Sequence, residues 1–111
     1  MTRLEARLWL AQRATAVVLA VCVLVHLATI LYAVRTGLSA EALLGRTRGN
    51  WGFAAFYATF VAAASAHGAI GLRTIAREWL GWHRGVGLAA FVFAIALASL
   101  GWRAVAAVVL A

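Results

Sequence analysis

Two long apolar runs of this sequence each contain one histidine, and these two residues are the side chains best suited to chemistry. His26 and His67 have only uncharged neighbours for several residues on both sides. An ionisable residue inside a membrane helix costs roughly 2 kcal/mol or more if charged, so it usually faces a partner or a cofactor. A neutral imidazole can bind a metal through one nitrogen while the other donates a hydrogen bond. The pair therefore indicates either metal ligation or a packing and proton-transfer role.

Both histidines share a helical face with small or polar residues, which predicts that these faces point into a bundle. The first face carries Thr15, Cys22, His26 and Thr29. The second carries Ala63, His67, Gly71 and Thr74, with Gly68 beside the histidine. Small residues let helices approach closely, or they leave space for a flat macrocycle over an axial ligand. We expect Cys22 to be a packing residue.

The elements that must position the histidines are membrane helices. Of the 111 residues, 66% are hydrophobic and 12% are charged, a balance outside the range of soluble domains. A bilayer core of roughly 30 Å needs about 20 apolar residues per helix. The sequence therefore predicts an all-α integral membrane bundle, a single domain over 1–111, with three spans at about 14–34, 52–72 and 87–109. No room remains for a soluble catalytic domain.

Three shorter features accompany the spans. Residues 1–13 are amphipathic and predict a separate segment lying in the membrane interface. Ser39–Leu44 predicts a short capped helix. Gly101–Arg103 interrupts the third apolar run, and Arg103 is expected to extend to the surface.

The net charge of +7 comes from ten arginines and no lysine. These arginines cluster between the apolar runs, which fits topology signals and lipid headgroups and argues against a nucleic-acid partner. Six lie at the N-terminus and between spans two and three, against four on the opposite side. The positive-inside rule therefore predicts a cytoplasmic N-terminus. The single cysteine excludes an iron–sulfur site held by this chain alone.

Depth distinguishes the two histidines. His26 lies about 20 Å beyond Arg13, and His67 about 9 Å before Arg73, at about 1.5 Å of rise per residue. If both arginines mark one membrane face, the imidazoles differ in depth by about 10 Å, to within about one helical turn. One six-coordinate haem needs both ligands at one level, so we expect each histidine to face a different haem. His83 lies in an interfacial loop, so the second ligands must come from another chain.

Two segments resemble a known family. Trp9–Ala16 (WLAQRATA) resembles the start of the first span in the small anchor subunits of succinate dehydrogenase. His67–Arg73 (HGAIGLR) resembles the pattern that carries a haem b ligand near the end of the second span. The resemblance implies a cytochrome b anchor of a bacterial inner membrane succinate dehydrogenase or fumarate reductase. It implies partners too: a flavoprotein, an iron–sulfur subunit, and a second anchor subunit or a second copy of this chain.

In that family, electrons from succinate pass through the iron–sulfur clusters to a quinone near the cytoplasmic face. The resemblance implies that His67 ligates the nearer haem b and His26 the more distant one. Arg13 and Arg73 are candidates for contacts to the quinone or to a haem propionate; the alternative is that they only set topology. The sequence lacks the family's serine before the first-span arginine, and Glu78-Trp79 replaces an aspartate-tyrosine pair, so the resemblance does not locate the quinone site.

Two other functions fit the same residues. One is a haem-free membrane adaptor or small transporter subunit, in which the histidines pack or relay protons. The other is the anchor of a different flavin-linked dehydrogenase with this architecture. Haem count, quinone type and reaction direction stay open at this point.

Overall fold

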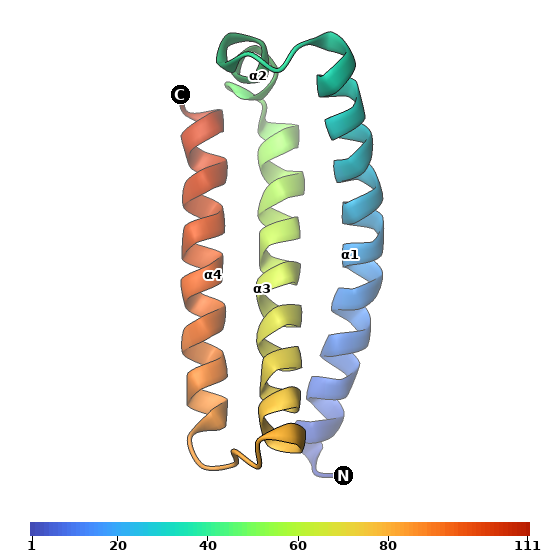
Figure 1. Cartoon of the computed structure of the whole chain (residues 1–111), viewed down its shortest axis with the longest axis vertical. Helices are drawn as coiled ribbons and strands as arrows, with labels where there is room; N and C mark the ends of the chain where they lie inside the picture. The colour runs from blue at the N-terminus through green and yellow to red at the C-terminus, as the bar shows by residue number, and fades with distance from the viewer.

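The computed structural model describes all 111 residues and contains four helices. They are α1 (Arg3–Thr36), α2 (Ala40–Thr47), α3 (Trp51–Trp79) and α4 (Val86–Val109). The three long helices are each long and apolar enough to cross a membrane, which confirms the predicted all-α bundle of three spans. The molecule is elongated, 49 × 22 × 22 Å. The N-terminus and the α3–α4 connection lie at one end, and α2 and the C-terminus lie at the other (Figure 1).

Residues 1–13, predicted as an amphipathic interfacial entry segment, are continuous with the first span, because from Arg3 onward they form the first turns of α1. Thr2 caps the helix through its hydroxyl, which accepts from the Glu5 backbone, while the Glu5 carboxylate accepts from the Thr2 backbone. This reciprocal cap fixes the start of the helix. No glycine or proline follows before Gly37, so nothing breaks the helix, which reaches 34 residues or about 51 Å.

The short helix α2 confirms the capped segment predicted after Ser39 and is longer than expected. Ser39 accepts a hydrogen bond from the Ala42 backbone at the N-cap. At its other end, the Thr47 hydroxyl donates to the Val108 carbonyl at 2.8 Å. α2 therefore lies across the end of the bundle and ties the α1–α3 connection to the end of α4 (Figure 1).

The third span is not interrupted at Gly101–Arg103, which corrects the sequence interpretation. Gly101 lies within α4 where this helix packs against α3, and a Cβ there would come within 2.5 Å of a Val61 methyl carbon. The Trp102 indole donates to the Ala58 carbonyl of α3 at 3.0 Å. The glycine is thus a close-packing residue and not a helix breaker. Arg103 is exposed, as expected.

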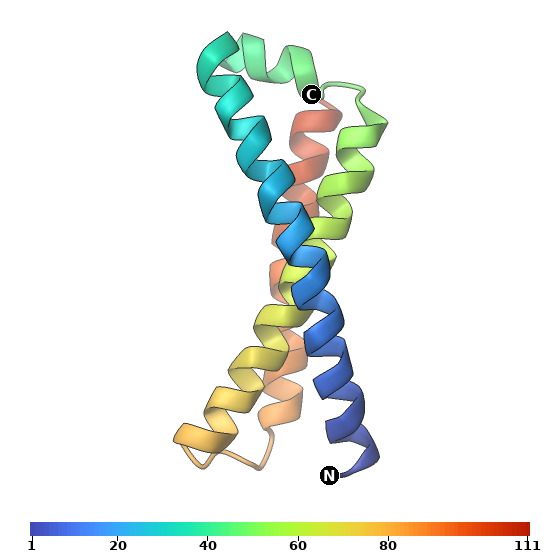
Figure 2. The same ribbon diagram turned by 90° about the vertical axis from the view of Figure 1, so that its right-hand side faces the viewer.

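α3 is the central helix and packs against both α1 and α4. α1 crosses it at an angle, and the two helices diverge toward both ends (Figure 2). Few residues are buried within the chain: Cys22, Ala63, Ser65, Ala69, Val86, Ala98 and Val109. Small residues at the helix contacts and large apolar residues outside are typical of a membrane bundle, whose outer faces meet lipid or partner helices.

Candidate functional site

Both histidines lie half-buried at the contact between α1 and α3, at different depths. The Thr15 hydroxyl of α1 lies 3.1 Å from His67 Nδ1 of α3. The Tyr57 hydroxyl of α3 lies 2.8 Å from His26 Nδ1 of α1. We call these the His67 level and the His26 level. Tyr57 and His67 are ten residues apart on α3, so the levels differ by about 15 Å.

This offset confirms that the histidines differ in depth, and it exceeds the expected 10 Å because the helix register differs from the one assumed. Four cross-helix contacts share one antiparallel register: Glu5 with Arg77, Gln12 with Gly71, Thr15 with His67, and His26 with Tyr57. In this register Arg73 lies level with Trp9 and not with Arg13. The two arginines therefore lie about one helical turn apart in depth. This turn accounts for the difference between the expected offset of about 10 Å and the observed offset of about 15 Å.

The Thr15 hydroxyl has polar neighbours on both helices. It lies 2.8 and 3.1 Å from the carbonyls of Ala11 and Gln12 on its own helix, and 3.1 Å from His67 Nδ1. If the hydroxyl donates to its own helix, its oxygen accepts from Nδ1, and the His67 lone pair then lies at Nε2, the nitrogen that would bind a metal.

The glycines near His67 serve helix packing within this chain. A Cβ at Gly71 would lie 3.4 Å from the Gln12 amide of α1, and one at Gly68 would lie 3.9 Å from the Leu97 side chain of α4. These residues thus let α3 approach its two neighbours and hold His67 in place. Space for a macrocycle must lie on the outer side of the α1–α3 pair.

Aromatic side chains surround His26. The rings of Tyr57 and Phe60 meet the imidazole edge-on, each with centroids 5.6 Å away. Thr29 lies 3.0 Å from the Tyr57 hydroxyl. Tyr57 was not predicted as a site residue. Its signal in the sequence is an aromatic stripe at helical spacing: Phe53, Phe56, Tyr57 and Phe60.

Both Nε2 atoms remain available to another molecule. Neither forms a hydrogen bond within the chain, whereas both Nδ1 atoms do. The Gln12 amide oxygen is the only enclosed side-chain polar atom without a partner, so neither Nε2 is sealed inside the chain. The two lone pairs therefore reach the surface of the three-helix unit, where a shared ligand would have to bind.

The candidate arginines occupy different surroundings. Arg13 is exposed, with its guanidinium 5.0 Å from the Trp9 ring centroid. Arg73 is half-buried on α3 and lines a groove on each side of that helix. Neither pairs with a carboxylate, since the one ion pair of the chain joins Glu5 to Arg77.

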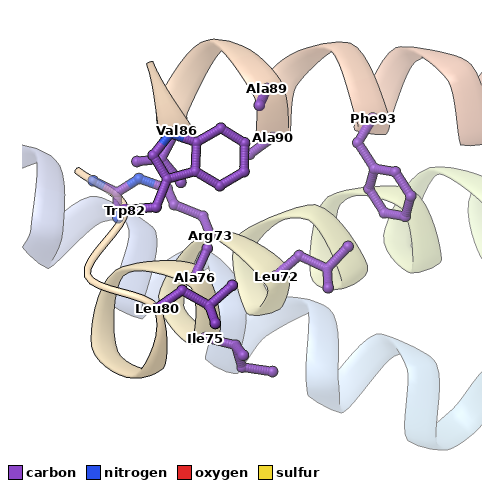
Figure 3. Close-up of a pocket in the computed structure, with 10 residues that line it drawn as sticks. All are labelled: Leu72, Arg73, Ile75, Ala76, Leu80, Trp82, Val86, Ala89, Ala90 and Phe93. Carbon is purple, nitrogen blue, oxygen red and sulfur yellow. The ribbon is translucent and has the colours of Figure 1, made fainter. Parts of the chain in front are cut away.

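The two grooves beside Arg73 differ in character. One, of about 320 Å³ between α3 and α4, is apolar, with Trp82 and Arg73 together at one end and Phe93 at the other (Figure 3). The second, of about 470 Å³ between α1 and α3, is polar. Its lining includes Gln12, whose amide oxygen is buried and unpaired, a group sequence reasoning missed. Arg13 lines neither groove.

Comparison with known proteins decides the family. The sequence model of the succinate dehydrogenase/fumarate reductase transmembrane subunit matches residues 1–103, which include every residue of the two levels and both arginines. The chain belongs to this family. No match to a curated protein or to a solved structure was found.

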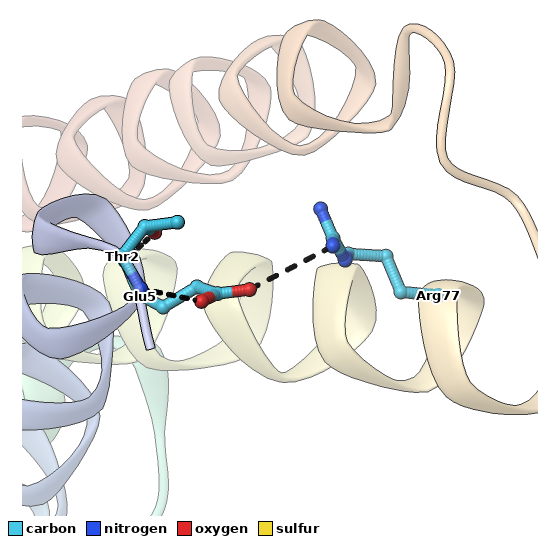
Figure 4. Close-up of polar contacts among 3 residues, drawn as sticks. All are labelled: Thr2, Glu5 and Arg77. Atoms are coloured by element: carbon cyan, nitrogen blue, oxygen red, sulfur yellow. Dashed lines mark hydrogen bonds and ion pairs between the residues drawn. The ribbon is translucent and has the colours of Figure 1, made fainter.

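Membership makes the chain a membrane subunit of succinate dehydrogenase or fumarate reductase complexes, and thus one component of a multi-subunit enzyme. In this transmembrane subunit, the ion pair between Glu5 and Arg77 joins α1 and α3 at the N-terminal end, at 3.8 Å (Figure 4). Thr2 holds the Glu5 carboxylate from the other side (Figure 4). The pair borders the polar groove that contains Gln12.

Proposed function

We propose that this chain is the cytochrome b anchor of a succinate:quinone oxidoreductase, in which His67 and His26 are axial ligands of two different haems b. The observation that carries the proposal is the 3.1 Å contact between His67 Nδ1 and the Thr15 hydroxyl, which leaves Nε2 without a hydrogen bond within the chain. With Nδ1 donating to Thr15, Nε2 carries the lone pair that would bind iron. When bound, haem iron supplies one-electron transfer by cycling between its ferric and ferrous states.

The metal ligands that this chain offers fit haems that are shared with another chain. Each level offers one imidazole nitrogen, whereas a six-coordinate haem needs two ligands at one height. An offset of about 15 Å prevents His26 and His67 from serving the same iron. The second ligand of each haem therefore comes from another chain, either a distinct anchor subunit or a second copy of this one.

The N-terminal end of the bundle is the proposed docking side for the flavoprotein and iron–sulfur subunits. It carries six of the ten arginines, which orients this end toward the cytoplasm in a bacterial inner membrane. The His67 level lies nearer this end than the His26 level. Electrons from the iron–sulfur subunit would reach the haem at His67 first.

The polar groove between α1 and α3 is the proposed quinone site. Arg73 lines this groove and can donate to a quinone carbonyl. A haem propionate is the alternative partner for Arg73. Arg13, on the exposed face beside Trp9, would contact a quinone or a propionate only across the interface with a partner subunit.

Haem content of the purified membrane complex tests the proposal. A reduced-minus-oxidised optical spectrum should show a b-type band, with about two haems per pair of anchor chains by pyridine haemochrome. His67→Ala should remove half of this signal, and His83→Ala, in the exposed α3–α4 connection, should remove none. A wild-type complex without haem would leave the chain as a haem-free adaptor.

A further inference from the structure

The hydrogen bonds around His26 form a closed ring. The Thr29 hydroxyl lies 2.7 Å from the His26 carbonyl and 3.0 Å from the Tyr57 hydroxyl. The Tyr57 hydroxyl lies 2.8 Å from His26 Nδ1. The path thus begins at the imidazole of His26 and returns to the backbone of the same residue. Tyr57 is the one member that belongs to α3, so the ring joins the two helices.

Iron bound at Nε2 would set the direction of each hydrogen bond. Nδ1 then carries the imidazole proton and donates to the Tyr57 oxygen. The Tyr57 hydroxyl donates in turn to Thr29, and the Thr29 hydroxyl donates to the His26 carbonyl. Three bonds running head to tail polarise one another, which strengthens each.

We propose that Tyr57 is a positioning residue that fixes the tautomer and orientation of His26 and thereby sets the reduction potential of the haem at this level. The inference rests on the proposed function. An acceptor on the Nδ1 proton makes the imidazole a stronger electron donor and stabilises ferric iron. Removing the acceptor should therefore raise the potential at the His26 level and leave the His67 level, about 15 Å away, unchanged.

The hydroxyl that accepts from Nδ1 is held in place differently at the two levels. At the His67 level, Thr15 is held by carbonyls of its own helix, so it depends on α1 alone. At the His26 level, the acceptor is the Tyr57 hydroxyl of α3, which in turn donates its own proton to Thr29 of α1. The electronic state of His26 is thus tied to the packing of α1 against α3.

A spectroelectrochemical titration of the purified complex tests the role of Tyr57. Tyr57→Phe keeps the aromatic ring and removes the hydroxyl. At a potential fixed near the midpoint of the haem at His26, the ferrous-to-ferric ratio of that haem should rise at least about threefold, given 59 mV per tenfold change for one electron. Loss of that haem alone also supports the role, because supporting hydrogen bonds contribute about 10–100-fold to metal affinity.

Two further variants keep the test decisive. Thr29→Val breaks the ring but keeps Tyr57, and it should shift the same haem in the same direction by less. Tyr32→Phe removes the hydroxyl of the other tyrosine, whose ring lies under Arg46, and should shift neither haem. Unchanged potentials in both Tyr57→Phe and Thr29→Val, with both haems present, would overturn the inference. A wild-type complex without haem would instead refute the proposed function.

Discussion

The His67 and His26 levels use the same two helices but different supports for the imidazole. At the His67 level, Nδ1 faces a threonine that also contacts carbonyls of its own helix, and glycines hold α3 close to its neighbours. At the His26 level, Nδ1 faces a tyrosine of the opposite helix amid aromatic rings. The grooves near the His67 level are lined by Arg73, whereas a cavity of about 640 Å³ lies beside Thr29 near the His26 level. The support of His67 therefore depends on one helix, and the support of His26 depends on the contact between two.

The largest expected effect comes from removing each histidine in turn. His67→Ala and His26→Ala should each abolish one haem and retain the other, because the two rings lie about 15 Å apart in depth. Low-temperature optical spectra resolve the two haems by their band positions and show which one is lost. Loss of the same spectral component in both variants would mean that the histidines serve one haem.

The next effect concerns the support of His67. Thr15→Val keeps the shape of the side chain and removes the acceptor for Nδ1. Haem affinity at the His67 level should fall by about 10–100-fold, measured by haem titration into the apo-complex. The His26 level should keep its affinity, which provides an internal control. Equal losses at both levels would show that Thr15 supports general packing and not the ligand.

A smaller effect is expected in the polar groove. Arg73→Gln removes the guanidinium that lines the groove, so the KM for quinone should rise about 2–10-fold, the value of one hydrogen bond. Succinate oxidation with a soluble acceptor should keep its rate. Arg84→Gln, outside the groove, is the control. An unchanged KM in Arg73→Gln would remove Arg73 as a quinone contact.

The smallest effect is expected at the ion pair of the N-terminal end. Glu5 and Arg77 are separated by 3.8 Å on the exposed side of both helices, where screening leaves little net stabilisation. Glu5→Gln should leave the Tm of the complex unchanged within error at both low and high salt. A clear fall in Tm at low salt only would show that the pair holds α1 against α3.

The three spans and the inward position of the two histidines could be predicted because hydropathy and ionisable groups within apolar runs are local properties of a sequence. The contact of Tyr57 with His26 could not be predicted, because it depends on which residue faces which across the helix contact. The depth offset could be predicted only to within about one helical turn for the same reason, since Arg73 proved level with Trp9. A repeating apolar pattern does not determine this register.

Gly101 was misinterpreted from the sequence because a glycine in an apolar run can either break a helix or let it pack closely. It suggested a break in the third span, but contact with Val61 makes it a packing position. At the other end of the chain, the reciprocal cap at Thr2 and the absence of any breaker join the amphipathic residues 1–13 to α1.

A cryo-electron microscopy structure of the intact complex in lipid tests the central claim most directly. We predict two haems, one with iron bonded to His67 Nε2 and one with iron bonded to His26 Nε2, at depths differing by about 15 Å. The Nδ1 atoms should still face Thr15 and Tyr57. Imidazoles whose Nε2 atoms face only lipid or neighbouring side chains would contradict the account.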